Sequence, residues 1–149
     1  AAVPEVQVKT ARLDSVALDD STQLECLDAT THLYLGDNRL TELDGLENLE
    51  HLRVLVVSGN RLRSLLPIAG LELEVLDVRH NVIASLEEDG VPVLPVTCQR
   101  LYLEGNPCHV GPDAAGYDAF VERIREMCPA IQVLDGEDVA VAVDDDEDG

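Results

Sequence analysis

LRVLVVSGNRL, residues 52–62, is the stretch of sequence that decides the fold. Leu55 and Val57 lie two residues apart, so their side chains point to the same side of an extended segment. Asn60 follows three residues after Val57. The pattern recurs as TTHLYLGDNRL at residues 30–40, LEVLDVRHNVI at 73–83 and CQRLYLEGNPC at 98–108. These copies predict parallel strands stacked side by side over one core of repeats.

An asparagine stands in each copy at the point where the chain turns away from its strand. The four are Asn38, Asn60, Asn81 and Asn106, at spacings of 22, 21 and 25 residues. A carboxamide at such a turn can bond free backbone groups of its own turn and of the adjoining one. We therefore expect a buried ladder with a structural role and no catalytic one.

The segments between the strands return the chain to the start of the next repeat. Leucines recur at every third residue from Leu40 to Leu55, a period that indicates one inward face on short 3₁₀ turns or a tight helix. The last return, between Ile83 and Leu101, is three residues longer than the first and contains Pro92 and Pro95. It is expected to be a looser loop.

The two ends of the repeat array require caps, because terminal repeats would otherwise expose the core. Apolar residues without an asparagine before residue 30 predict a degenerate first repeat, and Tyr117, Phe120, Val121, Ile124 and Met127 have the spacing of an amphipathic helix. Cys128-Pro129 should end this helix, and one apolar strand should follow. The expected organisation is an N-terminal cap with the degenerate repeat at residues 1–29, four repeats at 30–106, a C-terminal cap at 107–136 and a disordered acidic tail at 137–149.

The repeats fit the pattern LxxLxLxxNxL, and over roughly residues 13–136 the chain resembles the leucine-rich repeat superfamily. The segment from Asn106-Pro107 to Asp135-Gly136 is similar to the cap of the intracellular 22-residue-repeat subfamily, typified by the phosphatase-1 regulator, the leucine-rich axonemal dynein light chain and the spliceosomal A-prime protein. The resemblance implies a right-handed α/β solenoid with a parallel concave sheet, convex 3₁₀ or helical returns and a helical C-terminal cap. It also implies protein binding without enzymatic activity or a cofactor.

Composition excludes several other function classes. Thirty Asp and Glu residues against ten Lys and Arg residues give a formal charge of −20, which opposes direct binding to nucleic acid. No apolar run approaches the roughly 20 residues that cross a bilayer. Four scattered cysteines lack a CxxC pair, and only Cys108 directly follows Asn-Pro, unlike the disulfide caps of secreted relatives. This favours the cytoplasm, with the nucleus as the alternative.

The strand side chains that point away from the core should form the concave face, where the resemblance places partner contacts. Valines and tyrosines in its middle columns indicate an apolar patch with aromatic anchors, as in protein-binding surfaces. The alternative is a solvated sheet in which valine serves only β-propensity. The predicted partner-binding residues are His32, Tyr34, Arg53, Val54, Val56, Val75, Asp77, Arg79, Arg100 and Tyr102.

A metal or catalytic site is not expected. His32 and Asp77 lie two strands apart, about 10 Å, which is too far for shared coordination. His51 and His109 are expected to be solvated, and no nucleophile–base set or phosphate-binding glycine loop is present. The acidic tail is interpreted as solubilising, or as a contact for a basic partner.

These observations favour a scaffold or targeting subunit that holds a helix or extended segment of another protein. Cytoskeletal or ciliary machinery is the leading setting by resemblance. The alternatives are a phosphatase regulator and a nuclear acidic chaperone or ribonucleoprotein component.

Overall fold

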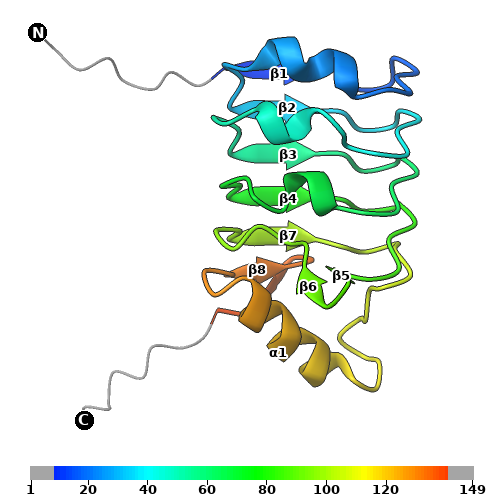
Figure 1. Ribbon diagram of the computed structural model, residues 1–149. Coiled ribbons are helices and arrows are strands. Elements are labelled where there is room, and N and C mark those ends of the chain that lie inside the picture. The colour runs from blue at the N-terminus through cyan, green and yellow to red at the C-terminus, as the bar shows by residue number, and fades with distance from the viewer. Residues whose placement is uncertain (1–8, 141–149) are drawn as a thin grey trace, which may run out of the picture.

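The structure, a computed structural model, describes residues 9–140 (Figure 1). Residues 1–8 of the predicted N-terminal cap and residues 141–149 of the predicted acidic tail lie outside the described residues. Among residues 9–140, no helix has the length and apolar character needed to cross a membrane.

One long sheet runs through the molecule in the order β1-β2-β3-β4-β7-β8-β9. Its strands from β1 to β8 pair in parallel, because each repeat returns the chain to the same side before the next strand begins. The register aligns Leu33 with Leu55, Leu55 with Leu76, and Leu76 with Leu101. The strands are β1 Thr10–Arg12, β2 His32–Tyr34, β3 Val54–Val56, β4 Val75–Asp77, β7 Arg100–Tyr102, β8 Val133–Leu134 and β9 Glu137–Asp138.

The core lies between this sheet and the returns. Leu55 and Val57 are completely buried, and so are the residues at the equivalent positions of β2, β4 and β7. Burial of an aliphatic side chain of this size stabilises a fold by roughly 1.5–3 kcal/mol. The parallel sheet and repeated core confirm the predicted solenoid of leucine-rich repeat type.

A left-handed residue precedes the asparagine position in every repeat. Asp37 has φ 55°, Gly59 72°, His80 59° and Gly105 84°. A Cβ atom on Gly59 would lie 2.3 Å from Asp37 Oδ1, and one on Gly105 would lie 2.3 Å from His80 Nδ1. Glycine suits these two turns because it adopts positive φ without strain and leaves room for the side chain of the preceding repeat.

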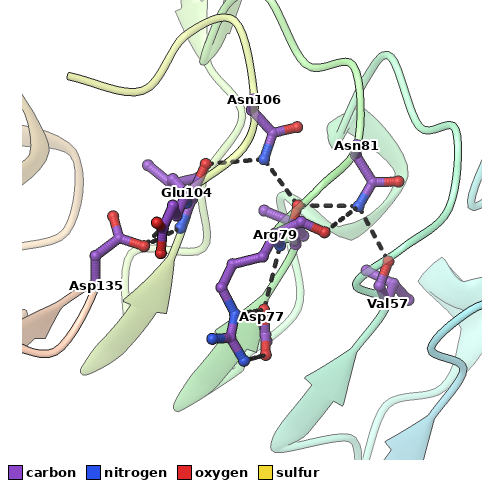
Figure 2. Close-up of polar contacts among 9 residues, drawn as sticks. Val57, Asp77, Arg79, Asn81, Glu104, Asn106 and Asp135 are labelled. Atoms are coloured by element: carbon purple, nitrogen blue, oxygen red, sulfur yellow. Dashed lines mark hydrogen bonds and ion pairs between the residues drawn. The ribbon is translucent and has the colours of Figure 1, made fainter. Parts of the chain in front are cut away.

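The four asparagines join neighbouring turns. Asn81 Nδ2 donates to the carbonyl oxygens of Val57 and Val78 over 3.0 and 2.9 Å (Figure 2), and Leu62 N donates to Asn81 Oδ1 over 2.9 Å. Asn38, Asn60 and Asn106 make equivalent bonds, and all four are buried. Each carboxamide therefore satisfies backbone groups of two successive repeats.

The returns contain short 3₁₀ helices, as the period of three predicts: η1 Thr22–Leu27, η2 Leu46–Asn48 and η3 Leu66–Ile68. The longer last return is different. It forms an antiparallel hairpin of β5 Glu87–Glu88 and β6 Val91–Pro92, so the prediction of a loose loop was wrong. Asp89 and Gly90 both have positive φ, which is the geometry that Asp-Gly favours in two-residue hairpin turns.

The C-terminal cap covers the last repeat. Helix α1 Tyr117–Met127 buries Val121, Ile124 and Met127, and Cys128 is its C-cap residue. Beyond it, β9 pairs antiparallel with β8 through a turn at Asp135-Gly136, both with positive φ. Because Val139 is buried and its carbonyl accepts a bond from Arg125, the placement of residues 137–139 in a disordered tail was wrong.

Candidate protein-binding surface

The outward side chains of the parallel strands form two columns, and we call this surface the concave face. In the sheet register, one column runs in the order His32, Val54, Val75 and Arg100, and the other runs in the order Tyr34, Val56, Asp77 and Tyr102. The register also adds three residues that the sequence analysis missed: Thr10 and Arg12 from β1 and Val133 from β8. Ala11 and Leu13, the apolar pair around Arg12, were the available signal for β1.

Apolar side chains occupy the middle of the concave face. Val54, Val56 and Val75 are half-buried, and half-buried tyrosines flank them at Tyr34 and Tyr102. The tyrosines lie on β2 and β7, three strand spacings apart, which is about 14 Å. An α-helix with its side chains is about 10–12 Å across, so this width accommodates one helix or an extended segment.

Arginines cover both tyrosine rings. The Arg12 guanidinium carbon lies 4.3 Å from the centroid of the Tyr34 ring, and that of Arg79 lies 5.2 Å from the centroid of Tyr102. Such cation–π contacts are worth about 0.5–1 kcal/mol at exposed sites. The contacts restrain both rings before a partner arrives, which reduces the entropic cost of binding.

Asp77 is largely buried, and in the unbound protein its carboxylate is engaged by Arg79. Its exposed fraction is 6%, and its carboxylate accepts bonds from Arg79 Nε over 3.0 Å and Arg79 Nη2 over 2.7 Å (Figure 2). The hydrogen bond to Asp77 raises the pKa of Arg79. This bidentate ion pair holds the Arg79 guanidinium near Tyr102.

The remaining basic residues of the concave face differ in whether another side chain pairs with them. Arg53 Nη2 lies 3.8 Å from Glu72 Oε1, so this pair is loose and exposed. Arg100 is exposed, and it has no ion-pair partner within residues 9–140. His32 Nδ1 lies 3.0 Å from Thr31 Oγ1. Arg100 is therefore available to an acidic or carbonyl group of a partner.

Comparison with known proteins agrees with this architecture. A family model described as Leucine Rich repeats (2 copies) matches residues 31–70. Leucine-rich repeat-containing protein 56 of Mus musculus and that of Homo sapiens are each 34% identical over 111 residues, covering 69% of this chain. The chain is a leucine-rich repeat protein. It spans 20% of the length of each of these two relatives.

A solved structure shows the same fold. The internalin InlF of Listeria monocytogenes superposes with a TM-score of 0.55 at 18% identity, covering 87% of this chain and 41% of the internalin. At that identity the likeness concerns the fold alone. Leucine-rich repeat solenoids typically act as non-enzymatic modules that bind other proteins.

Two further titratable side chains of this leucine-rich repeat protein, His109 and Cys108, are half-buried. Within the described part of the chain, no group of three or more His, Cys, Asp or Glu side chains is arranged to hold a metal ion. His109 was expected to be solvated, but it is half-buried, with Nε2 3.3 Å from Asp135 Oδ2 and its ring edge-on to Phe120. Burial raises the pKa of Cys108 to about 11, so its thiol stays protonated at neutral pH.

Proposed function

We propose that this leucine-rich repeat protein binds a segment of another protein across its concave face. The observation that carries the proposal is the row of half-buried valines between two tyrosines whose rings are already held by arginines. An apolar centre with aromatic anchors and a polar rim is typical of protein-binding surfaces. The proposed contacts are Arg12, His32, Tyr34, Arg53, Val54, Val56, Val75, Arg79, Arg100 and Tyr102.

The partner segment should present apolar side chains at its centre and an acidic side chain near Arg100. Burial of the exposed portions of Val54, Val56 and Val75 supplies the hydrophobic part of the affinity. The acidic group would neutralise Arg100, which otherwise loses hydration without compensation when the face is covered.

The proposed setting is a scaffold or targeting subunit of cytoskeletal or ciliary machinery in the cytoplasm. Its support is the resemblance of the repeats and the cap to the leucine-rich axonemal dynein light chain. The chain spans 20% of the length of these relatives, so the proposal concerns the repeat region alone.

Affinity capture from a lysate of ciliated cells tests both statements. The wild type should recover a partner that the Tyr34→Ala/Val56→Asp/Tyr102→Ala variant does not. Val96→Asp is the matched control, since Val96 is 65% exposed and lies outside the strands. Equal recovery by all three proteins contradicts concave binding. Recovery of a phosphatase or of nuclear ribonucleoproteins in place of axonemal or cytoskeletal proteins contradicts the setting.

A further inference from the structure

An apolar groove of about 580 Å³ opens between two successive returns, on the side of the molecule that carries the 3₁₀ helices. We call it the return groove. Leu43 and Asp44 line it from the return after β2, and Leu66 and Pro67 line it from the return after β3. Leu43 is buried in the core, whereas Leu66 is 52% exposed.

Leu66 is an exception to the repeat pattern. It follows the buried leucine of its return, and the equivalent positions of the neighbouring returns hold Thr22, Asp44 and Glu87. Leucine at this position therefore places apolar surface where the other repeats place polar side chains. In the next interval along the solenoid, the Ser64 hydroxyl donates a hydrogen bond to Glu88 of the β5–β6 hairpin.

Acidic side chains form the rim of the return groove. Glu42 and Asp44 stand beside it, and Arg63 is the one base among its lining residues. The hydrogen bond to Asp44, and then the negative charge of Asp44, raise the pKa of Glu42, and Asp20 adds to this effect. Within residues 9–140, neither Glu42 nor Asp44 has an ion-pair partner.

The acidic rim continues onto the preceding return. A second hollow of about 230 Å³ is lined by Asp19 and Asp20, and it shares Glu42 and Asp44 with the return groove. The two hollows thus adjoin one another across three successive turns. The lining is apolar at Leu66 and becomes more negative toward the preceding returns. The four carboxylates there are Asp19, Asp20, Glu42 and Asp44.

We propose that the return groove binds a basic segment of a second protein in extended conformation. Its apolar side chain packs on Leu66 and Pro67, and its Lys or Arg side chains reach Glu42 and Asp44 and then Asp20. Successive turns lie about 4.8 Å apart and an extended chain rises about 3.3 Å per residue, so two or three residues separate the apolar side chain from the last basic one. The protein then holds two segments of opposite charge on opposite sides.

Titration of the ¹⁵N-labelled full chain with a peptide containing Leu-Ala-Lys-Lys tests this proposal by chemical-shift mapping. Amide shifts are expected at residues 41–44 and 63–67. Glu42→Gln/Asp44→Asn and Leu66→Ser should each weaken binding by about tenfold, or about 1.4 kcal/mol, since the first removes two exposed charge pairs and the second removes one apolar contact. A peptide with Glu in place of both Lys residues should not bind.

Two matched controls separate this site from general charge effects and from the concave face. Asp28→Asn/Glu50→Gln removes two acids from another hollow on neighbouring returns and should leave the affinity unchanged. Tyr34→Ala/Val56→Asp/Tyr102→Ala should also bind the peptide like the wild type. Shifts confined to the concave strands, equal weakening by the Asp28 and Glu50 control, or no shift at millimolar peptide would overturn the proposal.

Discussion

The concave face and the return groove are built by the same repeats but have opposite chemistry. The concave face combines half-buried valines with Arg12, Arg79 and Arg100, whereas the groove combines an exposed Leu66 with uncompensated carboxylates. In each repeat the inward positions are constrained by the shared core. The outward positions are free, so the two surfaces can differ while the scaffold between them stays constant.

Removing a shared inward side chain should damage both surfaces and have the largest effect. Leu55→Ala leaves a cavity beneath β3, and we expect a loss of about 2–5 kcal/mol in the free energy of unfolding. Urea unfolding followed by circular dichroism measures it. Leu66→Ala is the matched control, because Leu66 is largely exposed. Equal losses in the two variants would contradict the core assignment.

Loss of an asparagine of the ladder should have the second-largest effect on stability, because the ladder joins neighbouring repeats without facing either surface. Asn81→Ala leaves the backbone partners of its carboxamide without bonds, and leaving buried groups unpaired costs about 1–3 kcal/mol. Asn48→Ala, on an exposed asparagine of η2, should change the unfolding free energy little. A stability of Asn81→Ala indistinguishable from that of Asn48→Ala would show that water replaces the ladder bonds.

A change under one surface should leave the other intact. Asp77→Asn removes the charge that holds Arg79 beside Tyr102. We expect the free energy of unfolding to fall by about 1 kcal/mol, because the Arg79 guanidinium is partly exposed. The variant should lose recovery of the concave partner and keep the affinity for the basic peptide. Glu104→Gln, an exposed acid after β7, is the control. A parallel change in peptide affinity would mean that the surfaces are coupled.

Apolar spacing predicted strands β2, β3, β4, β7 and β8, the register of the first four and the cap helix, because this spacing reports the shared core directly. It did not predict the β5–β6 hairpin or β9, which depend on Asp-Gly turns rather than on apolar periodicity. Asp77 was placed on the correct column, but its pairing with Arg79 could not be predicted because it depends on side-chain geometry. The return groove was missed because its residues belong to two returns that meet only in the fold.

The smallest effect on stability is expected where the return groove alone is changed. Leu66→Ser replaces a side chain that is 52% exposed, and substitutions at such surface positions usually change the unfolding free energy by less than about 0.5 kcal/mol. The same variant should weaken binding of the basic peptide by about tenfold. Val96→Ser, at another exposed apolar position, should change neither quantity. This outcome would show that Leu66 contributes to binding and not to folding, as expected of a docking contact. If Leu66→Ser instead destabilised the chain while peptide affinity stayed constant, Leu66 would be a packing residue of η3.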